Sequence, residues 1–463
     1  MKSVLLIDFG STYTKLTAVD VEQERILGTA AAYTTVETDI NNGLEAGLKI
    51  LESKIGTRDF DECYACSSAA GGLRMITSGL VPELTGEAAR LASLGAGAKV
   101  IKVCSFELTE EDVQDIREAK PDIFLLVGGT DGGNTECILH NAQVLADMKP
   151  DFPIVLAGNR TASKKCQEIL DGLDVYVCPN VMPKFGQLKI EDAQKQIREI
   201  FLKRIIHAKG LSRAAELLSD IMMPTPSAVL QAVELLSGGC EDEAGIGELI
   251  AVDVGGATTD IYSIADGMPE HMNTVYKGLP EPYAKRTVEG DIGMRYSIQG
   301  IVDCAGVSRI CELSGLSEDV VSTLLQDLKL NPDKIPEDNE DIKNLDYALA
   351  CCAVEEAVTR HAGTISESYT LLGKVLVQEG KNLTNVKNIV VTGGSLIHSE
   401  RIYEISEHAL YSLSNPSSLR PKSVDVWADK SYILAAMGLL SSYYPKTALK
   451  IMKKEFEYHG RSK

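Results

Sequence analysis

Two short segments of the chain carry the residue types that hold phosphate and a divalent cation. Residues 8–15 read Asp-Phe-Gly-Ser-Thr-Tyr-Thr-Lys, and residues 253–260 read Asp-Val-Gly-Gly-Ala-Thr-Thr-Asp. Glycine lets the backbone approach an anion, amides and hydroxyl groups donate hydrogen bonds to it, and the carboxylate binds a hydrated cation. Either segment alone is weak, but together they predict a polyphosphate site that includes a divalent metal ion.

Each of these segments is predicted to form a β-hairpin. An apolar strand from residue 3 leads into the first turn, and a second strand follows at 15–19. Residues 249–253 and 260–264 repeat this pattern around the second turn. Each copy is also followed by a later apolar strand that ends in a glycine pair, at 125–129 and at 389–394. We interpret the repeat as a duplicated α/β domain.

The chain between the two copies alternates apolar runs with helical patterns. The predicted strands lie at 62–66, 99–104, 123–127, 153–157 and 175–178, and the predicted helices run through 72–75, 109–119 and 190–236. This alternation is typical of βαβ units and a parallel sheet. An acidic, glycine-rich stretch at 238–245 precedes the second copy, so we expect a first lobe of 1–240 and a second lobe of 241–463.

Charge and cysteine usage exclude several classes of partner. The chain has 66 acidic and 46 basic side chains and a formal charge of −20, so its surface repels nucleic acid and anionic lipid. The eleven cysteines are irregularly spaced, which indicates reduced thiols and no disulfide framework. No apolar run approaches the ~20 residues that span a bilayer. We therefore expect a cytoplasmic protein that binds neither nucleic acid nor a membrane.

The whole pattern resembles the actin, Hsp70 and sugar kinase superfamily of ATPases. Its phosphate-1, phosphate-2 and adenosine motifs match residues 8–15, 253–260 and 390–395. The resemblance implies a duplicated ribonuclease H-like fold with two lobes around a nucleotide cleft, and ATP and Mg²⁺ as ligands. It implies that Asp8 and Asp253 hold Mg²⁺ through water and orient the attacking water. The implied nucleotide-binding residues are Gly10, Ser11, Thr12, Lys15, Gly255, Gly256, Thr258, Thr259, Gly393, Gly394 and Ser395.

A narrower match covers residues 1–445 and is carried by seven segments, at 67–74, 127–134, 157–159, 180–183, 223–226, 253–260 and 287–295. Together they resemble the MutL-type accessory protein of glutamate mutase, which is unrelated to the DNA mismatch-repair protein of that name. The resemblance implies a slow, chaperone-like, Mg²⁺-dependent ATPase. Its partner would be an adenosylcobalamin-dependent mutase, such as glutamate (methylaspartate) mutase or ornithine aminomutase, from which it promotes release of damaged cobalamin. The client mutase and the oligomeric state stay open.

Two other functions of the same fold remain as alternatives. A small-molecule kinase would need an acceptor pocket and usually an aspartate base, and a nucleotide-gated assembly protein would form oligomers. Two loops also stay open. Residues 128–134 either bind phosphate or a partner or form a tight structural turn. Glu289 and Asp291 either contact ribose hydroxyls or serve a helix that is predicted to begin at Thr287.

Overall fold

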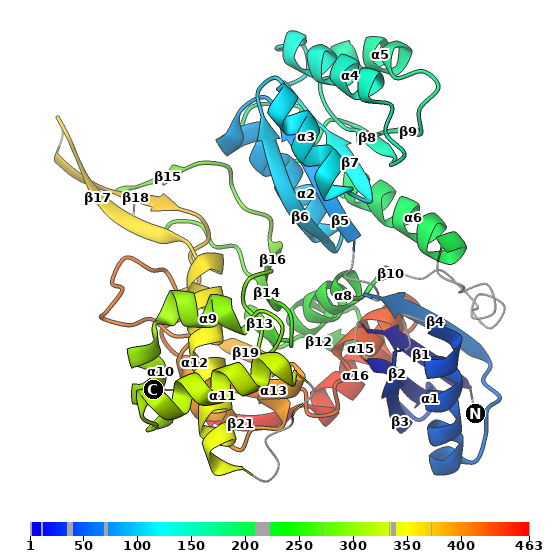
Figure 1. Ribbon diagram of the computed structural model, residues 1–463, viewed down its shortest axis with the longest axis vertical. Coiled ribbons are helices and arrows are strands. Elements are labelled where there is room, and N and C mark those ends of the chain that lie inside the picture. Colours follow the sequence, from blue (N-terminus) through cyan, green and yellow to red (C-terminus); the bar gives the residue numbers. More distant parts are fainter. Residues whose placement is uncertain are drawn as a thin grey trace. The chain divides into compact units, whose positions relative to one another are not determined.

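The computed structural model describes residues 2–10, 13–34, 40–68, 73–208, 223–270, 272–332, 334, 339–371 and 373–462 (Figure 1). The chain divides into two compact units. The first contains Met1–Ala232, Gly278–Pro280 and Ala435–Ile451, and the second contains Val233–Lys277, Glu281–Leu434 and Met452–Lys463. Along the described parts of the chain, no helix combines the length and the apolar character needed to cross a membrane.

Residues 435–451 belong to the first unit, whereas the expected second lobe included all of 241–463. The reason lies in side-chain contacts within the first unit. Tyr443 stacks on Tyr64 with ring centroids 4.2 Å apart, and Lys450 pairs with Glu24 at 2.7 Å. Helix α16 (Pro445–Glu455) carries this lysine.

The first unit is built around the first hairpin. Strand β1 (Ser3–Phe9) is buried along its whole length and pairs antiparallel with β2 (Tyr13–Asp20), which pairs with β3 (Arg25–Tyr33). On its other side β1 pairs parallel with β4 (Glu62–Ser67), and β4 pairs with β10 (Met223–Pro224). The strand order is therefore β10-β4-β1-β2-β3, with α1 (Ile40–Ile55) packed on β3.

The second unit repeats this order. Strand β13 (Leu249–Val254) pairs antiparallel with β14 (Thr259–Ile264), and β14 pairs with β16 (Ala284–Glu289). On its other side β13 pairs parallel with β19 (Asn388–Thr392), which pairs with β20 (Asp425–Ala428). The sheet continues to β21 (Glu457–Arg461). Two sheets with the same order of equivalent strands confirm the predicted duplicated α/β fold.

A separate sheet, with all its strands parallel, is inserted in the first unit between β4 and β10. Its order is β6-β5-β7-β8-β9, that is 2-1-3-4-5 along the chain, which is a doubly wound arrangement. The strands are β5 (Leu73–Gly79), β6 (Ala98–Ser105), β7 (Ile123–Leu126), β8 (Ile154–Leu156) and β9 (Val175–Val177). The helices around it are α2 (Glu87–Gly95), α3 (Glu110–Ala119), α4 (Glu136–Met148), α5 (Arg160–Ile169) and α6 (Glu191–Ala208) (Figure 1).

Three expectations are wrong. The segment after Gly72 forms β5 and not a helix. The glycine pair at 128–129 follows β7 of the inserted sheet, so it is not the counterpart of the pair at 393–394. In the duplicated sheet the counterpart of β19 is β4, because each pairs parallel with the first strand of its hairpin. Residues 284–289 form β16, so no helix begins at Thr287.

The remaining elements belong mainly to the second unit. They include α8 (Thr225–Gly238), the strands β11 (Gly239–Cys240) and β12 (Glu243–Ala244), and helices α9 (Ile298–Ala305), α10 (Val307–Ser314), α11 (Glu318–Leu330) and α12 (Glu340–His361). A separate three-stranded sheet joins β15 (Thr274–Lys277), β18 (Gly373–Glu379) and β17 (Thr364–Thr370). The other helices are η1 (Pro82–Gly86), in the first unit, and α13 (Gly394–Ile397), α14 (Ile402–Glu407) and α15 (Leu434–Ser441).

One lysine of the second unit is buried. Lys381 is 1% exposed, and its Nζ donates hydrogen bonds to the carbonyl oxygens of Pro282 at 2.8 Å and Tyr283 at 2.6 Å. Burial lowers the pKa of Lys381 to about 7, and the charge of Lys285 contributes in the same direction. Because the ordinary value is 10.5, this side chain loses its proton on folding over a wide pH range.

We therefore expect the stability of the second unit to rise with pH through Lys381. Above about pH 7 the unfolded lysine keeps a proton that the folded one releases, so the free energy of unfolding increases by up to about 1.4 kcal/mol per pH unit. Lys381→Met removes this component. Urea unfolding followed by Trp427, the chain's only tryptophan, reports on this unit. Exposed Lys189→Met is the control, and parallel pH profiles of wild type and Lys381→Met would contradict the prediction.

Candidate functional site

Asp8 lies at the end of β1 in a set of close polar contacts. Its side chain is buried, and the Thr225 hydroxyl donates a 2.6 Å hydrogen bond to Asp8 Oδ1. Lys15 is its register partner on β2, with Nζ 3.8 Å from Asp8 Oδ2. The Cys66 thiol, opposite on β4, lies 3.5 Å from Oδ1, and burial together with the Asp8 charge raises the pKa of Cys66 well above its ordinary value. Asp8 is thus a buried carboxylate oriented by a hydroxyl group.

The turn after Asp8 requires glycine at its first position. The Gly10 amide donates a 3.1 Å hydrogen bond to the Tyr13 carbonyl oxygen. A Cβ at Gly10 would lie 2.5 Å from that same oxygen, which is closer than real Cβ contacts. The predicted phosphate-binding residues Ser11 and Thr12 lie outside the described residues.

The second hairpin turn is fixed by the segment that follows β16. The Gly255 amide donates to the Thr258 carbonyl at 2.9 Å, as Gly10 does in the first hairpin. The Gly256 carbonyl accepts hydrogen bonds from the amides of Arg295 at 2.9 Å and Tyr296 at 2.8 Å. The segment 287–295, one of the seven that carry the resemblance to the MutL-type family, therefore supports the turn through its backbone.

The third predicted loop lies directly against Asp253. Strand β19 places Thr392 beside Asp253 in the parallel register, and Gly393 follows with φ +97°. A Cβ on Gly393 would lie 2.4 Å from the Val254 carbonyl oxygen and 2.8 Å from Asp253 Oδ1. The structure therefore brings the carboxylate, the hairpin turn and the glycine loop of the second unit to one edge of its sheet.

The other predicted residues of the second unit differ in exposure. Gly394 is exposed and Ser395 is half-buried, at the start of α13. Thr258 is half-buried in the turn. Thr259 is fully buried, and its hydroxyl donates to the Ile292 carbonyl at 3.0 Å, which serves the packing of the hairpin. These hydroxyl groups therefore divide between the exposed loop and the interior.

Sequence reasoning missed the partners that hold these residues. Thr225 lies in segment 223–226, one of the seven that carry the family resemblance, so the sequence did single out this region. Its contact with Asp8, however, joins residues 217 positions apart. Arg286 is buried on β16, the strand next to the second hairpin, and forms an ion pair with Asp260 at 2.6 Å. In neither pair does the spacing of the two residues along the sequence predict the contact.

Glu289 and Asp291, whose role the sequence left undecided, both form ion pairs with one arginine. Arg360 Nη1 lies 2.9 Å from Glu289 and 3.0 Å from Asp291. Burial raises the pKa of Glu289, while Arg360 opposes that change. The adjacent Arg295 forms a bidentate pair with Asp346, at 2.9 and 2.7 Å. Both acids thus act within an ion network at the end of β16 and do not cap a helix.

The loop at 128–134 is held by two buried asparagines. The Asn159 side chain accepts from the Gly132 amide at 3.1 Å and donates to the carbonyl oxygens of Gly133 and Asn134 at 3.2 and 3.0 Å. Asn180 donates to the Gly129 carbonyl at 3.1 Å and to Asp131 at 3.0 Å. These contacts fix the conformation of the loop.

The duplicated sheet, with one Asp-x-Gly hairpin in each unit, is the arrangement that the actin, Hsp70 and sugar kinase superfamily leads us to expect. The chain belongs to the MutL protein family, whose family model matches residues 4–456. It is 46% identical over 462 residues to Protein MutL of Clostridium tetanomorphum, covering 98% of this chain and 99% of that protein.

Solved structures are more distant. The chain is similar to a glycerol dehydratase reactivase, at 11% identity and a TM-score of 0.36, over 95% of this chain and 99% of that one. It is also similar to xylulose kinase from Bifidobacterium adolescentis, at 12% identity and a TM-score of 0.33, over 100% and 96% of the two chains.

The glycine loop gives a direct test of the second-unit geometry. Gly393→Ala places a Cβ against the Val254 carbonyl in left-handed backbone, so we expect a loss of about 2 kcal/mol or more in the free energy of unfolding. Gly394→Ala is the matched control, because a Cβ there meets nothing within 4 Å, and it changes stability by less than about 0.5 kcal/mol. Trp427 fluorescence during urea unfolding measures both, and equal effects would contradict the geometry.

Proposed function

We propose that this chain is a Mg²⁺-dependent ATPase that serves as an accessory protein to an adenosylcobalamin-dependent mutase. The observation that carries the proposal is the repeated Asp-x-Gly hairpin, found at the equivalent position of two sheets with the same strand order. Membership of the MutL family supports the accessory role. Glutamate mutase and ornithine aminomutase are the candidate clients, and release of damaged cobalamin is the proposed outcome.

The residues present fit a nucleotide and its metal ion. Asp8 and Asp253 are carboxylates at strand ends, suited to holding a hydrated Mg²⁺. Gly10 and Gly393 stand where any Cβ would collide with backbone, and a Cβ at Gly393 would also lie 2.8 Å from Asp253 Oδ1. We propose that the turns at 10–12 and 255–259 donate hydrogen bonds to phosphate, and that 393–395 contacts the adenosine. When bound, Mg²⁺ supplies charge neutralisation at the phosphates.

Asp8 has the better-defined role in this proposal. Thr225 donates to one of its oxygens, and Lys15 lies 3.8 Å from the other. The hydroxyl group fixes the orientation of the carboxylate, and the lysine is near enough to pair with a phosphate oxygen once a nucleotide is bound. Asp8 and Asp253 would orient the attacking water without a dedicated strong base, so we propose slow hydrolysis that relies on electrostatic stabilisation.

The test is phosphate release from Mg-ATP by the purified chain. Asp8→Asn and Asp253→Asn keep side-chain size but remove the charge, and we expect each to lower the rate by about 100-fold. Asp171→Asn, at an exposed position of the first unit, is the matched control and keeps the wild-type rate. ATP binding is measured separately, so that loss of binding and loss of turnover are distinguished.

The same assay identifies the client. Glutamate mutase or ornithine aminomutase is first inactivated with its damaged cobalamin in place and then added with adenosylcobalamin. Stimulated hydrolysis together with recovered mutase activity supports the accessory role, provided that both are lost in Asp253→Asn. Hydrolysis that responds to neither mutase would overturn the client assignment, and absence of ATP binding would overturn the ATPase assignment.

A further inference from the structure

A small sheet of the second unit has little of its surface covered. It consists of β15, β18 and β17 in that order, and its β17–β18 hairpin projects from the unit (Figure 1). Its residues belong to none of the described hydrophobic clusters, and Gln378 is its only described side chain that is buried. Large apolar side chains are exposed instead: Val275 is 55% exposed, Tyr369 77%, and Leu371, in the turn, fully. Such a sheet normally has a partner.

Strand β17 forms one edge of this sheet, and its main-chain groups are open on the outer side. Near the start of the strand, the Ile365 amide donates a 2.8 Å hydrogen bond to the Ser417 carbonyl, on the side away from β18. Because main-chain groups alternate between the two sides of a strand, those of Glu367 and Tyr369 also face outward. Beyond the contact at Ser417, no strand among the described residues pairs with this side. The edge is therefore a template for another strand.

The sheet is locally neutral, although the chain has a formal charge of −20. Its strands contain four charged residues, and these form two pairs: Glu367 with Lys374, and Glu379 with Lys277 at 2.9 Å. Two copies of an acidic chain repel each other, so they meet best where the contact adds no further like charge. The edge of β17 is such a place, whereas a strongly basic partner would find no unpaired negative charge on it.

We propose that β17 pairs antiparallel with β17 of a second copy of this chain. The two-fold axis would pass beside Ser368, so that Glu367 of each copy lies opposite Tyr369 of the other and exchanges both main-chain hydrogen bonds with it. Both of these residues face outward, as this register requires. An axis beside Glu367 would also join outward groups, but it would set the two Glu367 carboxylates opposite each other, which is unfavourable. Charge therefore selects the register about Ser368.

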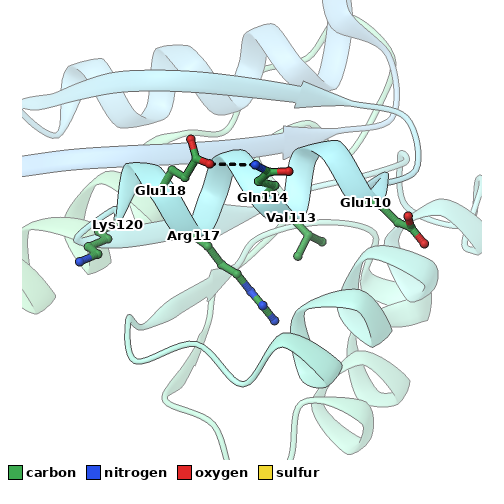
Figure 2. A pocket seen from close by; sticks show the side chains of 6 residues that line it. All are labelled: Glu110, Val113, Gln114, Arg117, Glu118 and Lys120. Atoms are coloured by element: carbon green, nitrogen blue, oxygen red, sulfur yellow. Dashed lines mark hydrogen bonds between the residues drawn. The ribbon is translucent and has the colours of Figure 1, made fainter.

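A hollow along α3 offers a different exposed surface. It is lined by Glu110, Val113, Gln114, Arg117, Glu118 and Lys120 (Figure 2). Gln114 donates a 2.9 Å hydrogen bond to Glu118, so two of these side chains already pair with each other. A helix uses its main-chain groups internally, and this lining is mostly polar and charged. It has neither the open edge nor the exposed large apolar side chains of the β17 sheet.

The first experiment measures the oligomeric state of the full chain by sedimentation velocity between about 1 and 100 µM, where a small interface is expected to associate. Glu367→Pro removes an N–H that the hairpin does not use, and proline is tolerated at such positions of edge strands. We expect wild type to be in monomer–dimer equilibrium, and Glu367→Pro to dissociate with a constant at least about tenfold higher. Glu367→Ala keeps the N–H and is the matched control, with dimerisation close to that of wild type.

Two results of this experiment would overturn the proposal. One is a wild-type chain that stays monomeric over the whole range, which is also the result if the edge instead takes a strand of another protein. The other is a Glu367→Pro variant that dimerises as wild type does, because the contact would then lie elsewhere. Neither result depends on the proposed ATPase.

A cysteine cross-link tests the register without removing a main-chain group. Ser368→Cys would set a thiol opposite its own copy, at a Cα separation that a disulfide spans, so we expect covalent dimers on mild oxidation. Ser366→Cys is the matched control, because it is also exposed and on the same face but lies away from its own copy. It also accounts for cross-linking through the exposed Cys304. Equal cross-linking of the two variants, or none with Ser368→Cys, would contradict the register.

Discussion

The candidate site depends on one interaction that occurs in both units. In each, the first strand of the hairpin pairs parallel with a strand from later in the chain. In the second unit β13 pairs with β19, which sets Thr392 beside Asp253 and brings Gly393 against the carboxylate. In the first unit β1 pairs with β4 in the same way, which sets Cys66 beside Asp8. The ladder of backbone hydrogen bonds therefore fixes which side chains surround each aspartate.

The sequence was informative where the signal is local. An aspartate at the end of an apolar run, followed by glycine, specifies a strand and its turn within about ten residues, and both hairpins have the predicted form. Sheet membership is not local: Gly129 and Gly393 both follow apolar strands, but those strands belong to different sheets. Strand β5 is buried at nearly every position and so has no alternating pattern. Strand β16 ends at Glu289, and Thr287 followed by Asp291 has the residue types of a helix start, which favoured a helix in the sequence.

The surroundings of the candidate site have no signal in the sequence comparable to that of the two aspartates. Asp8 and Asp253 were predicted from their motifs, whereas Thr225 and Arg286 enter only through contacts that folding creates. A buried ion pair depends on the packing of distant elements, and a single sequence does not encode it in any spacing.

The division of the chain into units has a consequence for how the protein is made. The chain passes from one unit to the other at 232, 277, 280, 434 and 451, so neither unit is a contiguous stretch of sequence. On the ribosome, the first unit lacks α15 and most of α16 until nearly the whole chain has been synthesised. The sheet that contains β1, and the surface that Tyr443 covers, therefore stay partly exposed to water while the second unit is translated. Expression of either half alone removes structure from both units.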